Sequence, residues 1–377
     1  MPVKDRVVTW YIRNVILPRR EIIDKPGFVI TSLSGEYHTI LLRDLFLPEL
    51  LFELIENNIV QQYDMKGRQA LYSAGKKFGY IYSSMSSFPT IQNSSKKEFS
   101  DFAYFLVRFV EGTYAQQAKH KLELDKKIFT ISFDDYIICR HNGIGHIMTE
   151  GGITGIWSYA MQDKSIEGVQ LECQGRGNER CIVLCAPEKI IKERSNKFFR
   201  EQDLSDQKFD NIYKTMNAIR PTKYSSNSLK KLLNAGFFKF KRGVLSYKGH
   251  RFFACDSYIL YFLEEELIKL ENGEQILFDT CFEYGKYLRE LYAGVDYQKF
   301  IPDFFSALGF GDIFVIPSDE IKIASIYYPW THLSEKSKYV ILRGLMSGIV
   351  SSSLGKKIEF TKYNISVKNY LTLTIIA

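Results

Sequence analysis

The stretch Gly151–Pro187, GGITGIWSYAMQDKSIEGVQLECQGRGNERCIVLCAP, carries the pattern that decides the fold. Gly151 and Gly155 are spaced by four positions in a predicted helix, and a predicted strand with Cys173 follows that helix. A turn rich in glycine and asparagine leads to a return strand, and Cys181 lies eight positions after Cys173. The stretch therefore predicts a helix followed by a β-hairpin, with a thiol on each arm of the hairpin.

A fainter copy of this pattern lies near the C-terminus, at Arg343–Ala377, RGLMSGIVSSSLGKKIEFTKYNISVKNYLTLTIIA. Gly344 and Gly348 repeat the glycine spacing, Ser366 aligns with Cys173, and the copy contains no cysteine. One unit therefore occurs twice in the chain, and only the first copy has the thiol pair. This asymmetry predicts that any ligand- or metal-dependent activity belongs to the first copy.

Elements upstream of each copy recur in the same order. The first half shows a strand pair from Gly27, a helix Asp44–Asn57 and a helix centred on Gly75. The second half shows a hairpin that turns at residues 247–250, a helix from Tyr258 and a helix around Gly285. We therefore expect two tandem domains, residues 1–187 and 235–377, joined by a helical, basic linker at 188–234.

The composition is that of a globular protein. The chain has 377 residues, of which 45% are apolar and 15% aromatic, which is enough for the cores of two domains. Charges or prolines interrupt every apolar stretch before the roughly 18 to 20 residues that a membrane span needs. No secretory signal pattern opens the sequence. Six cysteines do not form a disulfide scaffold, so we expect a reducing, cytoplasmic setting.

The net charge of +7 is unevenly distributed, because residues 221–255 contain no acidic side chain. Such a basic segment is typical either of a solvated linker face or of a surface that binds DNA or RNA phosphates. The candidate nucleic-acid contacts are Lys230, Lys231, Lys239, Lys241, Arg242, Lys248 and Arg251.

The stretch 151–187 resembles the 4-vinyl reductase domain family, whose hallmark is a glycine-spaced helix followed by two cysteines with seven residues between them. Cys173 and Cys181 have this spacing. The resemblance covers about residues 20–187 and, more weakly, 235–377. It implies an α+β fold for each copy, a twisted antiparallel sheet with helices packed on it, as in trafficking-complex subunits of the TRAPP type. It also implies a sensor module with an apolar pocket for a small ligand.

The pocket that the resemblance implies lies in the first domain. The residues assigned to it are Phe102, Phe105, Phe109, Gly151, Gly155 and Trp157. Two structural alternatives stay open here. The helical spacing of the phenylalanines is also typical of a core, and the glycine spacing also lets a helix approach a neighbour closely.

Some members of the family bind zinc beside the pocket, which implies a site at Cys173 and Cys181 with His146 as a third ligand. Glu172 or Cys185 would be the fourth. Thiolates and imidazole are the ligands that zinc prefers. The chain departs from the family at Gln170, where a glutamate is usual, and His146 lies within about one residue of a missing upstream cysteine. A disulfide between Cys173 and Cys181, or two inert buried thiols, are the alternatives.

Catalytic patterns are absent from the sequence: no nucleophile motif is present, and the Asp134–Asp135 pair is typical of a solvated turn. We therefore predict a non-enzymatic sensor or regulatory protein that binds a small apolar molecule. The two copies are expected to pack against each other like the subunits of a homodimer. Two other functions stay open, a nucleic-acid-associated transcriptional regulator and a scaffold that binds other proteins.

Overall fold

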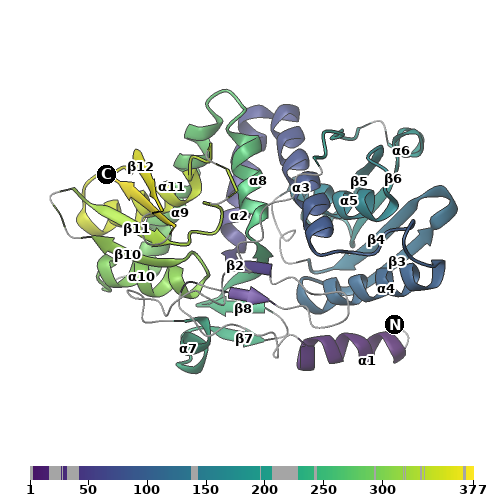
Figure 1. Ribbon diagram of the computed structural model, residues 1–377, viewed down its shortest axis with the longest axis horizontal. Coiled ribbons are helices and arrows are strands. Elements are labelled where there is room, and N and C mark those ends of the chain that lie inside the picture. The colour runs from purple at the N-terminus through teal and green to yellow at the C-terminus, as the bar shows by residue number, and fades with distance from the viewer. Residues whose placement is uncertain are drawn as a thin grey trace.

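The computed structural model describes residues 3–16, 27, 29–31, 42–136, 143–195, 197–205, 228–241, 244–292, 294–316, 318, 320–331, 333–334, 336–367 and 371–377. It has the predicted α+β architecture, with antiparallel sheets and helices in two domains (Figure 1). Within the described residues, no helix has the length and apolar character that a membrane crossing needs.

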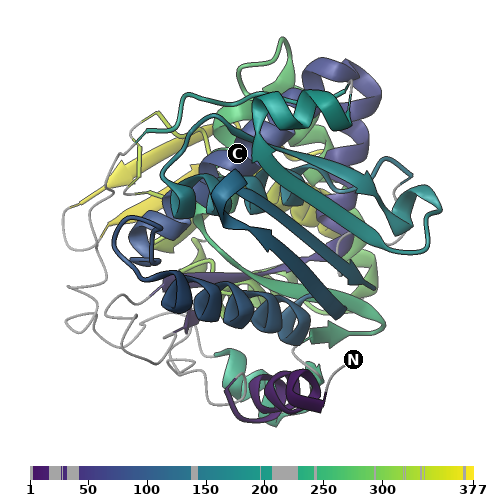
Figure 2. The ribbon, with the colours of Figure 1, turned by 90° about the vertical axis from the view of Figure 1, so that its right-hand side faces the viewer.

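The first half ends in the sheet β3-β4-β6-β5, which is antiparallel throughout. Its elements in chain order are α1 (Val3–Tyr11), η1 (Ile12–Ile16), β1 (Val29–Thr31), β2 (Leu42–Pro48), α2 (Glu49–Tyr63), α3 (Met65–Met85), α4 (Lys96–Thr113), β3 (Gln116–Glu123), η3 (Leu124–Lys126), β4 (Ile128–Asp134), α5 (Ile147–Met161), β5 (Ile166–Glu172), η4 (Gln174–Arg176) and β6 (Cys181–Pro187). Figure 2 shows this sheet face-on, with α4 along its lower edge and α1 beneath α4. The predicted glycine-spaced helix and hairpin are thus α5, β5 and β6.

The second half ends in the sheet β10-β11-β13-β12, at the opposite end of the molecule in Figure 1. The elements that follow β6 in the chain, including the linker helices α6 and α7, are α6 (Glu188–Arg194), α7 (Leu229–Asn234), β7 (Lys239–Lys241), β8 (Val244–Tyr247), β9 (His250–Asp256), α8 (Tyr258–Leu267), α9 (Gly273–Leu291), α10 (Tyr297–Ala307), β10 (Asp312–Ile316), β11 (Lys322–Ile326), α11 (Val340–Leu354), β12 (Lys362–Ser366) and β13 (Thr372–Ile376). The predicted turn is present, because Lys248 and Gly249 both have positive φ between β8 and β9.

A central sheet, β1-β2-β9-β8-β7, joins the two halves. The halves meet where β2, from the first half, pairs with β9, from the second. The two strands run antiparallel, with Asp44 opposite Asp256 and Pro48 opposite Phe252. This shared sheet adds to the sheet that each copy forms from its own strands, and it was not predicted from the sequence. The pairing gives the backbone groups of β2 and β9 hydrogen-bond partners that each strand would lack at a sheet edge.

Close helix packing explains the repeated glycines. A Cβ atom on Gly155 of α5 would lie 2.1 Å from the carbonyl oxygen of Lys76 in α3. A Cβ atom on Gly348 of α11 would lie 2.0 Å from the carbonyl oxygen of Phe282 in α9. The same small residue therefore allows the same backbone contact in both halves.

A second feature recurs in both halves and was not predicted from the sequence. Glu56 of α2 accepts the Met148 N–H at the start of α5, at 3.0 Å. In the second half, Glu264 of α8 accepts the Ile341 N–H at the start of α11, at 2.8 Å. Both carboxylates are buried. Each satisfies a backbone donor that the first turn of a helix leaves without an intrahelical partner.

The predicted helix Asp44–Asn57 needs a correction, because residues 44–48 are the strand β2 and the helix begins at Glu49. Pro48 has φ −64° and ψ 128°, which is an extended conformation. A proline disfavours helical geometry in the residue before it and tolerates the start of a helix after it. The proline therefore marks the strand-to-helix boundary, and not a position inside the helix.

The predicted helical linker is only partly helical in the described residues. α6 and α7 lie at its two ends, whereas residues 197–205 have no regular secondary structure. The stretch 206–227 lies outside the described residues.

Candidate functional site: an apolar cavity between the two halves

A cavity of about 180 Å³ lies where α4 and α5 meet the central sheet. Its lining is mainly aromatic and aliphatic. The apolar lining residues are Phe78, Tyr82, Phe88, Phe102, Phe105, Leu106, Phe109, Val110, Tyr114, Tyr136, Met148, Ile153, Ile156, Phe253, Ala254 and Ile259. Apolar walls with a few polar groups are typical of small-molecule sites.

The structure places three of the six predicted pocket residues in this cavity, namely Phe102, Phe105 and Phe109. Gly151 and Gly155 do not line it, because they face α3, where a Cβ atom would lie 2.2 Å or 2.1 Å from a backbone oxygen. The intervening Gly152 lines the cavity, and a Cβ atom there would meet only the Gly75 oxygen, at 3.8 Å. The sequence pattern identified the correct helix but the wrong face of it.

Trp157, the sixth predicted residue, lines a neighbouring cavity of about 50 Å³. Its ring stacks on Phe129 with 4.9 Å between centroids, and its indole N–H donates to the Lys127 carbonyl oxygen at 2.9 Å. Phe102, Leu106, Val110, Ile153 and Ile156 line both cavities and form the wall between them.

The second half completes the cavity, which the sequence analysis did not predict. Residues 253–256 of β9 and Ile259 of α8 line it opposite α4. The Tyr114 hydroxyl at the end of α4 donates to the Ala254 carbonyl oxygen at 2.7 Å, so a hydrogen bond links the halves at the cavity wall. No local signal reveals this arrangement, because it depends on the pairing of strands that are about two hundred residues apart in the chain.

The polar side chains among the lining residues are Asp44, His146, Thr149, Cys255 and Asp256. The Asp256 Oδ1 atom accepts the Tyr258 N–H at 2.9 Å, and His146 Nδ1 lies 2.6 Å from Glu56 Oε2. Burial, and then the carboxylates of Asp44 and Asp256, raise the pKa of the Cys255 thiol well above its usual value.

The corresponding region of the second half is closely packed. α10 buries Phe300, Phe304 and Phe305. The rings of Tyr292 and Phe300 lie 4.4 Å apart, and those of Phe300 and Phe304 lie 5.1 Å apart. α4 differs, because Phe105 is 37% exposed there and its neighbours face a cavity.

The four predicted zinc ligands do not form a single group, although two of them are close together. The Cys173 and Cys181 Sγ atoms lie 3.9 Å apart, in a buried apolar cluster, whereas His146 contacts Glu56 in a different core. Glu172 is half-buried on β5. Among the residues that the structure describes, no three His, Cys, Asp or Glu side chains are grouped to hold a metal ion. The separation of the thiols also exceeds a disulfide bond of about 2.05 Å.

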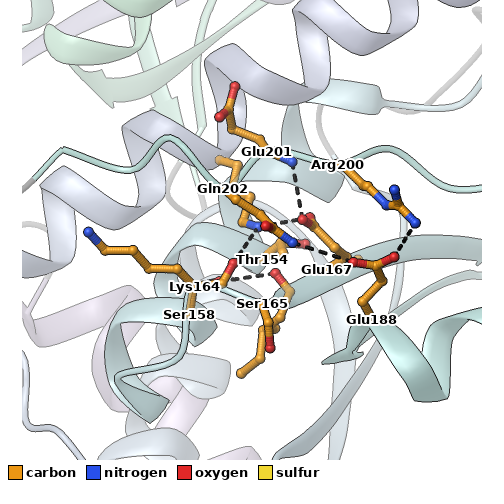
Figure 3. A network of polar contacts seen from close by, with 12 residues as sticks. Thr154, Ser158, Lys164, Ser165, Glu167, Glu188, Arg200, Glu201 and Gln202 are labelled. Atoms are coloured by element: carbon orange, nitrogen blue, oxygen red, sulfur yellow. Dashed lines mark hydrogen bonds and ion pairs between the residues drawn. The ribbon is translucent and has the colours of Figure 1, made fainter.

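A polar network joins α3, β5 and the segment 197–205 (Figure 3). Lys76 Nζ lies 2.8 Å from Glu167 Oε2, and both side chains are inaccessible to solvent. The Tyr72 hydroxyl donates to the same carboxylate at 2.6 Å, and the Glu201 N–H donates to Glu167 Oε1 at 3.1 Å. The segment 197–205 thus covers an ion pair, and Lys164 anchors that segment through the Leu204 carbonyl oxygen at 2.6 Å.

The residues predicted to contact nucleic acid differ in their exposure and in their partners. Four of them are exposed on α7 and β7: Lys230, Lys231, Lys239 and Lys241. Arg251 instead donates two hydrogen bonds to the Glu49 carboxylate, at 2.6 Å and 2.5 Å. Lys248 donates to the Leu291 carbonyl oxygen at 2.7 Å. Arg242 lies outside the described residues.

Comparisons with known proteins do not decide the fold or the function. No protein-family model matches the chain, and no curated protein matches it. One solved structure that it resembles is the phenol-responsive sensory domain of the transcription activator PoxR with phenol, at 15% identity. The match covers 52% of this chain and 97% of that one, with a TM-score of 0.33. A likeness this loose supports no statement about the function of the chain.

Proposed function

We propose that this protein binds a small molecule with a single ring in the cavity between α4, α5 and the central sheet. The observation that carries the proposal is the cavity itself, about 180 Å³ with largely apolar walls. An apolar cavity of about 150 Å³ engineered in another protein stays dry and binds benzene. The size and lining of this cavity therefore suit one aromatic ring with a small substituent.

A regulatory role follows from where the cavity lies. Its walls come from both halves, with Phe102 and Ile156 on one side and Ala254 and Ile259 on the other. A ligand that contacts both halves stabilises the arrangement in which they are joined, and so shifts the population of the molecule toward that state. The protein would act as a sensor, and the second copy would be a structural partner for the first.

Gly152 is a suitable position for a test, because it lines the cavity and a Cβ atom there would meet no backbone atom closer than 3.8 Å. Gly152→Leu would fill the cavity, whereas Gly152→Ala, the matched control, would leave most of it open. Isothermal titration against a panel of benzyl alcohol, phenol and benzylamine should show binding to the wild type and to Gly152→Ala. Binding should be lost in Gly152→Leu.

Two results would contradict the proposal. One is that none of these ring compounds binds the wild type. The other is that Gly152→Leu binds them with unchanged affinity, which would place the site elsewhere. Thermal denaturation of Gly152→Leu shows whether the variant is folded, so that loss of binding is not confused with loss of structure.

The likeness to the 4-vinyl reductase domain family stays a prediction, supported by the helix–hairpin pattern of α5, β5 and β6. Zinc binding, the absence of enzymatic activity and the cytoplasmic location stay predictions as well.

A further inference from the structure

The side of α1 that faces solvent is apolar. Val3, Val7 and Trp10 are 77%, 58% and 59% exposed, and Tyr11 beside them is 49% exposed. At 3.6 residues per turn, these side chains form one stripe along the helix. A patch of adjacent exposed apolar side chains with a polar rim is typical of a surface that contacts a partner or a membrane.

The opposite side of α1, continued by η1, is anchored on α4. Ile12 is buried against Phe109, and Val8 packs on the same pair. The Tyr104 hydroxyl donates to the Asp5 carboxylate at 2.8 Å. The helix is therefore held by its buried side while the apolar stripe faces outward.

Basic side chains surround the stripe. Lys4 and Arg6 are exposed and fall on either side of it. The elements α7 and β7 lie along the same lower edge of the molecule as α1 (Figure 1, Figure 2). Phe240 of β7 is also exposed. The exposed lysines of these two elements are Lys230, Lys231, Lys239 and Lys241. In the sequences of α1, α7 and β7 the one acidic residue is Asp5, which binds Tyr104.

We propose that this edge of the molecule docks on a membrane surface that contains anionic phospholipid. The stripe of α1 enters the boundary between headgroups and acyl chains, where tryptophan and tyrosine side chains are favoured. The exposed basic side chains of α1, α7 and β7 contact the lipid phosphates. The proposal concerns attachment to a surface and is independent of the ligand of the cavity.

Charge and hydrophobicity together favour a lipid surface over other partners. Two copies of the chain joined symmetrically through this edge would bring the same basic side chains together, and like charges repel. A nucleic acid would match the charge but would leave the side chains of Val3 and Val7 in water. An anionic membrane satisfies both the charge and the apolar stripe.

Cosedimentation of the full chain with vesicles tests the proposal. One set of vesicles is phosphatidylcholine alone, and the other is an equal mixture of phosphatidylcholine and phosphatidylserine. The chain should bind the mixed vesicles at least about tenfold more tightly, because each basic side chain near an anionic surface contributes roughly fivefold in affinity. Added salt should weaken this binding.

Tryptophan fluorescence reports whether the stripe enters the bilayer. Trp157 and Trp330 are buried, so a change in solvent exposure on binding falls on Trp10. The emission should move to shorter wavelength when the mixed vesicles are added.

Val7→Ser/Trp10→Ser should lose most of the vesicle binding and keep the fold, because both side chains are exposed. Val367→Ser is the matched control, because Val367 is an equally exposed valine that follows β12. This control should bind like the wild type. Circular dichroism shows whether each variant is folded.

Lys239→Gln/Lys241→Gln should weaken binding to the mixed vesicles by at least about tenfold. Lys336→Gln/Lys356→Gln changes the net charge equally at exposed positions near the two ends of α11, and should bind like the wild type.

Four results would overturn the proposal. The first is that the wild type binds neither kind of vesicle, and the second is that it binds both equally. The third is that Val7→Ser/Trp10→Ser binds with unchanged affinity. The fourth is that the wild type binds a DNA duplex, or forms a dimer that Val7→Ser/Trp10→Ser abolishes, without binding vesicles, which would assign this edge to a nucleic acid or to a second copy.

Discussion

Three neighbouring glycines of α5 have different roles, because their Cα–H bonds point in different directions. Gly151 and Gly155 face α3 and allow backbone contact, whereas Gly152 faces the cavity. The sequence pattern predicted the importance of Gly151 and Gly155 but could not separate packing from ligand contact. Periodicity identifies a face of a helix, and only the tertiary structure shows what lies against that face.

The two kinds of glycine should respond in opposite directions to alanine. Gly155→Ala should destabilise the fold by about 1–3 kcal/mol, because its methyl group would overlap the Lys76 carbonyl oxygen. Gly152→Ala should stabilise it by up to about 1 kcal/mol, because alanine is the better helix former and its Cβ atom would lie at an ordinary contact distance, 3.8 Å, from the Gly75 oxygen. Urea denaturation measures both changes, and equal effects at the two positions would contradict the assignment of the faces.

Glu150, near the start of α5, makes stability depend on pH. Burial raises the pKa of this carboxyl from 4.5 to about 8, although it accepts the Gln170 N–H at 3.0 Å. The folded state therefore holds a proton that the unfolded state releases between these pH values. The stability that this proton confers is present below pH 4.5 and is lost as the pH rises to about 8, at up to about 1.4 kcal/mol per pH unit.

Glu150→Gln should flatten this dependence, because the amide stays neutral and can still accept the Gln170 N–H. Urea midpoints measured at pH 5 to 9 should fall less steeply with pH in the variant than in the wild type. Glu264, whose pKa burial raises to about 7, contributes a slope of the same sign, so some dependence remains. Identical slopes in variant and wild type would show that Glu150 does not hold the proton.

At the scale of elements, the sequence was informative wherever a local pattern fixed the structure. The helix–hairpin of α5, β5 and β6 and the turn at Lys248 and Gly249 were predictable, because glycine spacing and turn residues act locally. The strand β2 was not predictable, because the apolar run around it also has the spacing of a helix. The capping roles of Glu56 and Glu264 were not predictable from the sequence either, because each carboxylate binds the start of a helix far along the chain.

The two capping carboxylates give an element-scale prediction. Glu264→Ala should destabilise the fold by about 1–3 kcal/mol, because the buried Ile341 N–H loses its acceptor. Glu264→Gln should cost less, since the amide oxygen can still accept. Denaturant titration followed by circular dichroism compares the two variants, and an equal loss in both would mean that the hydrogen bond to α11 is not what stabilises the fold.

At the scale of the whole molecule, the two halves share one sheet and one cavity. Lys77 of α3 lies 2.8 Å from Glu266 of α8, and Asn58 of α2 donates to Thr280 of α9 at 2.9 Å. With the β2–β9 pair, these contacts join the first half to the second through buried and partly buried surface. The sequence predicted that the copies pack together, but not that both contribute strands to a common sheet.

This sharing predicts that the halves do not fold alone. Fragments 1–205 and 206–377, made separately, should each lack a cooperative urea transition, because β2 and β9 would become unpaired, apolar edges. Mixed during refolding, the fragments should form a one-to-one complex on a sizing column. Cooperative unfolding of either fragment alone, with the stability that it has in the full chain, would show that the central sheet is not a joint structure.

The central claim is that an open apolar cavity lies between α4, α5 and the central sheet and accepts one ring. Diffraction from crystals of the full chain soaked in bromobenzene tests it most directly, because bromine gives an anomalous peak and apolar cavities of this size take up benzene. We predict a peak between Phe102, Ile156 and Ala254, and none there in Gly152→Leu crystals. Side chains that fill this space in the wild type, with no bromine peak between them, would contradict the claim.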